Sequence, residues 1–146
     1  MATEHALDRL GFLLARHGQV MNLRLRQALS VSGLSPRHAS TLIRLARAGA
    51  TTQQALLDVL AVDPSGLVAI LNDLERDGLV ERRRDPADRR RHIVEITKAG
   101  CATAAEVERA IAEVEQDAFA QLDDSEVDQL RSLLARVHSR TDGDAC

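Results

Sequence analysis

Six arginines lie in the 11 residues from Arg82 to His92, where only Asp85 and Asp88 oppose them. A guanidinium group stays charged and forms paired hydrogen bonds with phosphate oxygens, so such a cluster suits the backbone of a nucleic acid. The net charge of the whole chain is −3, which excludes binding to nucleic acid by bulk charge alone. The alternative is a solvated turn whose arginines bind nothing.

The residues before the cluster predict a helix that starts at Asp63 and stops at Gly78. Asp63 suits the N-cap, Pro64 suits the first helical position, and Gly78 suits a left-handed C-cap. The helical spacing of one apolar stripe supports this prediction, and its members are Leu67, Ile70, Leu71 and Leu74.

The arginines themselves fall in a predicted β-hairpin, with strands at residues 79–83 and 91–97 and a turn at residues 85–88. A helix followed by a basic hairpin is the layout of a winged helix-turn-helix. Residues 1–94 hold 14 basic and 10 acidic side chains, whereas residues 95–146 hold 5 and 12. Placement of the charge therefore favours phosphate binding over the solvated turn, with the helix in the major groove of DNA.

The other elements are predicted to be helices at residues 7–29 and 35–49, a short one after residues 51–54, and two long ones after Thr97 and Asp123. Thr51, Thr52, Gln53 and Gln54 are interpreted as a capping box. The predicted fold class is mainly α with a small β-hairpin wing (α+β). The expected domains are an N-terminal dimerisation helix (1–34), the winged domain (35–97), C-terminal dimerisation helices (98–140) and a frayed tail (141–146).

The terminal helices exceed what a winged domain needs for its own core, so their apolar stripes are expected to bury against a second copy. Two recognition helices would then lie about 34 Å apart and contact an inverted repeat in DNA. The predicted dimer-interface residues are Leu7, Leu10, Val127, Leu130, Leu134 and Val137.

Composition predicts a cytoplasmic protein. No run approaches the ~20 apolar residues of a membrane span, and Glu4, Asp8 and Arg9 interrupt any signal-peptide core. Cys101 and Cys146 are too few for a disulfide framework, and Cys101 is interpreted as an inert thiol. The five histidines lack the spacing of a metal site, and neither a cofactor motif nor a catalytic motif is present, so we expect no metal, no cofactor and no enzyme.

Three stretches resemble the MarR family of bacterial transcription regulators. Residues 51–82 resemble its helix-turn-helix and first wing strand, residues 85–100 its wing, and residues 122–137 its final dimerisation helix. The resemblance implies a homodimer that represses promoters and is released by a small aromatic or anionic effector, or by oxidation. It also implies that Arg90 enters the minor groove, with Asp88 orienting its side chain.

The exposed face of the predicted recognition helix supplies further DNA contacts. Asn72 is expected to form a paired contact with adenine, Ser65 to meet a base or phosphate, and Arg76 to meet phosphate. Asp73 departs from the basic residues common in the family, and it would repel phosphate unless it pairs with Arg76 or Arg37 or accepts from cytosine. The complete predicted DNA-binding set is Ser35, Arg37, His38, Ser65, Gly66, Ala69, Asn72, Asp73, Arg76, Arg84, Asp88, Arg89, Arg90 and Arg91.

In this family the effector commonly binds where the dimerisation helices meet the winged domain. The residues expected there are Leu13, Arg16, His17, Val20, His38 and Leu42. The alternative is that Arg16 and the two histidines only form hydrogen bonds across that junction. For the protein as a whole, the alternative is a winged-helix protein-interaction module with weak or no specific DNA binding.

Overall fold

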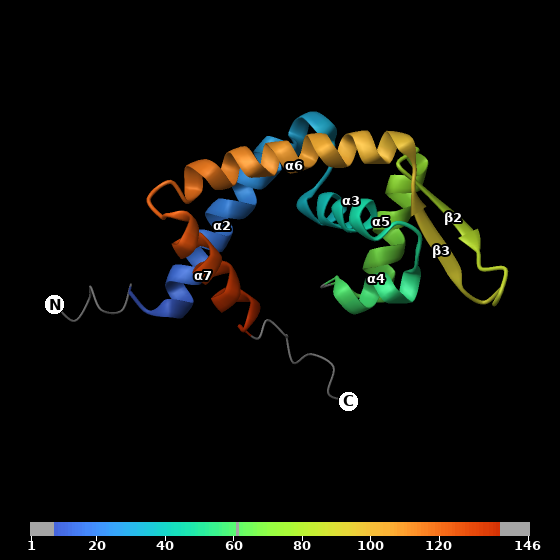
Figure 1. The fold of residues 1–146 in the computed structure, drawn as a ribbon, viewed down its shortest axis with the longest axis horizontal. Coiled ribbons are helices and arrows are strands. Elements are labelled where there is room, and N and C mark those ends of the chain that lie inside the picture. Colours follow the sequence, from blue (N-terminus) through green and yellow to red (C-terminus); the bar gives the residue numbers. More distant parts are fainter. Residues whose placement is uncertain (1–7, 61, 138–146) are drawn as a thin grey trace. The chain divides into compact units, whose positions relative to one another are not determined.

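The computed structural model describes residues 8–60 and 62–137. The chain divides into two compact units, Met1–Val114 and Glu115–Cys146, which are considered separately below. The first unit contains the elements from α2 to β3 and most of α6 (Figure 1). Their bounds are α2 Leu10–Leu29, the 3-10 helix η1 Ser30–Ser32, α3 Pro36–Ala48, β1 Thr51–Thr52, α4 Gln53–Val59, α5 Pro64–Arg76, β2 Val80–Arg84, β3 His92–Ile96 and α6 Lys98–Ala118.

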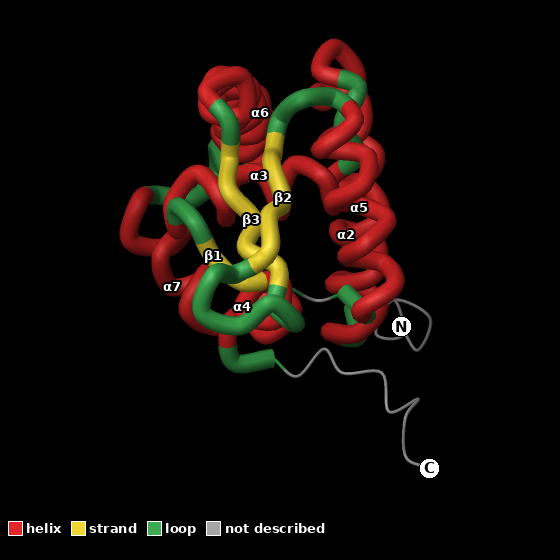
Figure 2. The backbone as a smooth tube through the Cα atoms, turned by 90° about the vertical axis from the view of Figure 1, so that its right-hand side faces the viewer, coloured by secondary structure: helices red, strands yellow, loops and turns green. Residues whose placement is uncertain are grey.

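The sheet has three antiparallel strands in the order β1-β3-β2, with β3 in the middle (Figure 2). The sequence predicted only the hairpin β2–β3, in which Val80 pairs with Ile96 and Arg84 with His92. Thr51 and Thr52 add the third strand by pairing with Val94 and Ile93.

This pairing also corrects the predicted capping box. Because Thr51 and Thr52 are both in β1, α4 starts one residue later than that box requires. Thr52 is the N-cap, and its hydroxyl oxygen accepts from the Ala55 backbone N–H at 3.1 Å. Alanine at this third helical position cannot return a side-chain bond to the cap, so only half of a capping box exists.

The core of the first unit is aliphatic. The predicted stripe of α5 (Leu67, Ile70, Leu71, Leu74) is buried there, together with Leu42 and Leu45 of α3, Val80 and Val94 of the sheet, and Ala104 and Val107 of α6. The start of α6 therefore contributes to the winged domain, and the first unit extends to Val114. Burial of each Leu or Val side chain stabilises the fold by about 1.5–3 kcal/mol.

The end of α5 and the start of α6 are tied to each other. Gly78 has φ 73°, and the backbone N–H groups of Gly78 and Leu79 donate to Glu75 and Leu74, as in a Schellman C-cap. The Thr97 hydroxyl donates to the Gly78 carbonyl at 2.7 Å, and its oxygen accepts from the Gly100 backbone N–H at 3.0 Å. Both predicted helix boundaries are confirmed.

Gly100 is required by close packing. A Cβ at this position would lie 2.1 Å from the Leu79 carbonyl oxygen and 2.6 Å from a side-chain carbon of Ile96. The Thr-x-x-Gly pattern after the wing is thus explained by two needs. The threonine caps α6, and the glycine lets α6 approach the backbone that leads into β2.

The second unit contains α7, Asp124–Ala135. It starts after Asp123, as the sequence predicted, and Asp123 and Glu126 also form a reciprocal capping box there. Of the predicted interface residues, Val127 and Leu130 are half-buried, Leu134 is 46% exposed, and Val137 is 49% exposed and follows the helix. In the first unit Leu10 of α2 is 80% exposed, while Leu7 lies outside the described residues.

Within residues 8–60 and 62–137, no individual helix combines the length and apolar composition of a membrane span; α4 and α5 reach them only as a pair bent by 116°.

Candidate nucleic-acid interface

Helices α4 and α5 form a helix-turn-helix. The two are bent by 116° relative to each other, within the range of about 90–120° typical of this motif. Because one side of α5 is buried in the core, its other side is the surface available to a ligand. The hairpin β2–β3 extends beyond α4 and α5 (Figure 1).

The predicted contact residues do lie on the outer side of α5. Ser65, Ala69, Asn72 and Arg76 are exposed, whereas Gly66 and Asp73 are half-buried.

The first turn of α5 is closed by Asp63. One oxygen of this cap accepts from the Gly66 backbone N–H at 2.5 Å and from the Ser65 hydroxyl at 3.2 Å. A Cβ on Gly66 would lie 2.7 Å from that oxygen, so a larger residue here would require the Asp63 side chain to shift. The hydrogen of Ser65 is thus used inside the protein, and its oxygen remains able to accept.

Asp73 is engaged by two partners, and the predicted alternative partner Arg37 is not one of them. His38 Nε2 lies 2.9 Å from one carboxylate oxygen, and the Arg76 guanidinium donates to the other at 2.7 Å. His38 Nδ1 is 2.6 Å from the Ser35 hydroxyl, at the N-cap of α3. Because an ionised carboxylate can only accept, Nε2 must carry the proton.

These bonds change the charge that α5 presents. The hydrogen bonds from His38 and then from Arg76 hold the pKa of Asp73 below its ordinary value, so the residue is ionised. Its charge is compensated by Arg76 one turn later. The repulsion between Asp73 and phosphate that the sequence suggested is therefore offset by Arg76 on α5 and His38 on α3.

Arg82 contacts the outer side of α5, and the sequence did not single it out as a site residue. Its side chain is only 20% exposed, and it donates to Glu75 at 2.9 Å and to the Asn72 amide oxygen at 2.5 Å. The bond to Arg82 holds the pKa of Glu75 below its ordinary value. The expected paired contact of Asn72 with adenine needs this same oxygen, so Arg82 and adenine would share or compete for its two lone pairs, and the contact stays a prediction.

A signal for Arg82 existed in the sequence. Alternate residues of a strand point to the same face, so Arg82 shares the face of the buried Val80, next to α5. Its neighbours Arg83 and Arg84 are exposed, and Arg83 pairs across the hairpin with Glu95 at 2.9 Å.

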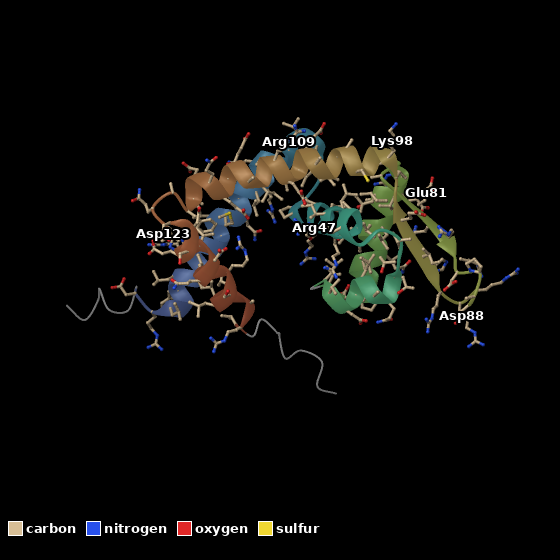
Figure 3. All side chains as sticks on the ribbon, viewed as in Figure 1. Arg47, Glu81, Asp88, Lys98, Arg109 and Asp123 are labelled. Atoms are coloured by element: carbon tan, nitrogen blue, oxygen red, sulfur yellow. The ribbon has the colours of Figure 1, made fainter. Side chains whose placement is uncertain are left out.

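The tip of the wing carries the remaining arginines, and Asp88 lies at this far end (Figure 3). The expectation that Asp88 orients the Arg90 side chain is wrong. One carboxylate oxygen of Asp88 accepts from the backbone N–H of Arg90 at 3.1 Å, and the other lies 3.7 Å from Arg91 Nε. Asp88 thus shapes the turn and leaves the exposed guanidinium of Arg90 without a partner among the described residues.

The other predicted DNA contacts flank α5 and the wing. Arg37 is exposed in the first turn of α3, and Arg89 is exposed at the wing tip, where its carbonyl accepts weakly from Arg84 at 3.5 Å. An open groove between α4 and the wing is lined by Gln53 and Gln54 on one side and by Arg90 and Arg91 on the other.

The predicted effector residues are not brought together as expected. Leu42 is fully buried in the core, and the ring of His38 is turned to Asp73. Arg16, His17 and Val20 are exposed on α2, and Leu13 is half-buried. Only the four α2 residues remain available to a ligand.

In the described part of the chain, no three His, Cys, Asp or Glu side chains come close enough to hold a metal ion.

A family model described as "MarR family" matches residues 32–91. A protein of Thauera aromatica, named as a transcriptional regulatory protein for the hcr operon, is 35% identical over 131 residues, which cover 88% of this chain and 78% of that protein.

Solved structures agree with this match. A structure named as a probable transcriptional regulator from Pseudomonas aeruginosa superposes with a TM-score of 0.80 at 32% identity, covering 88% of this chain and 96% of the other. The transcriptional repressor CouR bound to a 23-mer DNA duplex gives 0.80 at 31% identity, with 86% and 89% coverage. CouR from Rhodococcus jostii RHA1 bound to p-coumaroyl-CoA gives 0.79 at 27% identity, with 87% and 89% coverage.

Proposed function

This chain belongs to the MarR family of transcription regulators, and on that premise we propose that it is a homodimeric repressor that binds an inverted repeat in double-stranded DNA. The observation that carries the proposal is the outer side of α5, exposed beside an arginine-rich wing, in a domain whose acidic residues on α5 are already paired. CouR, at 31% identity, is a repressor solved on DNA, which supports the same role here.

Each part of the surface has its own task in this proposal. Helix α5 enters the major groove, where Asn72 and Arg76 meet bases or phosphate, with Ser65 at its first turn. Arg90 enters the minor groove, because its guanidinium is exposed and free of internal partners. Flanking phosphate contacts come from the exposed side chains of Arg37, Arg84, Arg89 and Arg91.

The dimer would form through the terminal helices. Leu10, Phe12 and Leu14 at the start of α2 are between 48% and 80% exposed. In α7, Leu133 and Leu134 are 58% and 46% exposed. Large apolar side chains left open on two helices are typical of an interface with a partner, and a second copy is the partner that a twofold operator requires.

We also propose that a small aromatic or anionic effector regulates DNA binding. CouR is solved with p-coumaroyl-CoA, an acyl thioester with an aromatic body and an anionic carrier. Arg16 and His17 could hold such an anionic group and Leu13 and Val20 an apolar body, all on α2. A thermal-shift screen of aromatic carboxylates and their coenzyme A thioesters tests this idea. A ligand whose affinity is the same for wild type and Arg16→Ala/His17→Ala would place its site elsewhere.

Genome-wide selection tests the main proposal. The purified protein is mixed with fragmented DNA of its source, and the bound fragments are sequenced. We expect an inverted repeat whose affinity falls steeply as salt rises, because phosphate contacts release counterions. A protein-interaction module would retain no specific fragments and no steep salt dependence. As a regulator of transcription without a catalytic role, the protein would act in the cytoplasm.

A further inference from the structure

Arg82 restricts what Asn72 can offer to DNA. A guanidinium has five N–H donors and no acceptor, so only the amide oxygen of Asn72 can face it. The 2.5 Å bond between them, together with the 2.9 Å bond from Arg82 to Glu75, fixes the orientation of the amide. The Arg82 side chain is 20% exposed, whereas Asn72 is exposed and can be reached by DNA.

The consequence concerns hydrogen-bond polarity. An unrestrained asparagine recognises adenine with two bonds, because its oxygen accepts from N6 and its nitrogen donates to N7. Arg82 takes one of the two lone pairs of that oxygen and so competes with adenine for it, whereas both N–H donors of the amide nitrogen stay free. In the major groove these suit guanine, which displays the acceptors O6 and N7 side by side.

The neighbouring residues do not offer a free acceptor in place of this oxygen. Each oxygen of Asp73 already accepts one bond, one from His38 and the other from Arg76. Arg76 itself can only donate. Glu75 gives one oxygen to Arg82 on the side of the wing. The hydroxyl oxygen of Ser65 remains, but it lies two turns away at the start of α5.

We propose that Arg82 is a specificity-determining residue that biases Asn72 toward donating hydrogen bonds and so favours a G·C pair over an A·T pair at one position of each operator half-site. The inference rests on the proposed DNA-binding function and deepens it. Arg82 acts through Asn72 and touches no base itself.

Selection from a library of randomised duplexes tests the inference. Wild type and Asn72→Ala are compared, and the position whose preference disappears in the variant is the one that Asn72 contacts. We expect that position to be G·C in the wild-type operator, enriched about fivefold or more over A·T, the low end for a specific base contact. An A·T preference there overturns the inference, as does a variant that keeps every wild-type preference.

Arg82→Met then tests the cause, since methionine keeps much of the length of the side chain and removes all its donors. The freed oxygen of Asn72 should move the preference at that position toward A·T. Arg83→Met is the matched control, because Arg83 lies on the same strand but is exposed and pairs with Glu95. An unchanged G·C preference in folded Arg82→Met overturns the role of Arg82.

The outcomes separate this inference from the function on which it depends. If wild type selects no duplex at all, the proposed DNA binding itself is wrong. If it selects an operator, the pair at the Asn72 position still decides the inference, even when Arg82→Met does not fold.

Discussion

Gly100→Ala tests how the wing is attached to α6. The new methyl group would lie 2.1 Å from the Leu79 carbonyl oxygen, and a backbone atom cannot turn aside. That oxygen also accepts from the Thr97 backbone N–H at 3.0 Å. Overpacking costs about 1–3 kcal/mol and a weakened hydrogen bond about 1 kcal/mol, against a gain of up to about 1 kcal/mol from helix propensity. We expect a net loss of about 2 kcal/mol.

Urea unfolding at one fixed protein concentration measures this loss, since dimerisation makes stability depend on concentration. With a slope of about 2 kcal/mol per molar urea, the midpoint should fall by about 1 M. Gly18→Ala in α2 is the matched control, because a Cβ there meets nothing within 4 Å. If Gly100→Ala unfolds at the wild-type midpoint, the close approach of α6 to Leu79 is wrong.

Three further predictions concern binding, assembly and pH. Arg90→Ala should weaken operator binding by about 1–3 kcal/mol without changing stability, because its side chain is exposed. Gel shifts measure the affinity, and Arg131→Ala, which removes an exposed arginine of α7, is the control. Equal affinities of the two variants would contradict the prediction. The double variant Leu130→Asp/Leu134→Asp should sediment as monomer or aggregate and lose DNA binding, since unpaired charges are costly to bury. Gln129→Asp, at an exposed position of the same helix, is the control. A stable dimer of the double variant would show that α7 is not part of the interface. Asp73 and Glu75 have lowered pKa values in the folded state, so their stabilisation should be complete above about pH 4.5 and should be lost on acidification. In Asp73→Asn, the free energy of unfolding should depend less steeply on pH below about pH 4.5. An unchanged pH dependence would mean that the His38 and Arg76 bonds contribute nothing to stability.

Local signals predicted much of this fold correctly. The cap at Asp63, the start of α6 after Thr97 and the left-handed Gly78 depend on residues within a few positions of each other, and the structure has them where the sequence placed them. The apolar stripe of α5 was equally predictable from the sequence, because helical spacing alone defines it. Strand β1 was missed, because two residues have no measurable period and Thr51 and Thr52 pair with β3 some 40 residues later.

The site was predicted only as a list of exposed positions. Which of these residues remain free depends on partners distant in sequence. His38 reaches Asp73 from 35 positions earlier, and Arg82 reaches Asn72 from ten positions later. The sequence suggested other roles for these two residues. It predicted that His38 would contact DNA or an effector, and it counted Arg82 only as one of the six wing arginines.

The same bonds that decide which side chains of α5 can donate or accept hydrogen bonds also limit how this helix can move. His38 ties α5 to α3 on one flank, and Arg82 ties it to β2 on the other. To tilt α5 alone, an effector would have to break both ties, leaving Glu75 uncompensated near phosphate and Asp73 paired with Arg76 alone, on top of the loss of core packing. Moving the winged domain as a whole keeps every one of these bonds. We therefore expect release from DNA to proceed by a change in the spacing of two intact winged domains, which an effector achieves only through its preference for one spacing over the other.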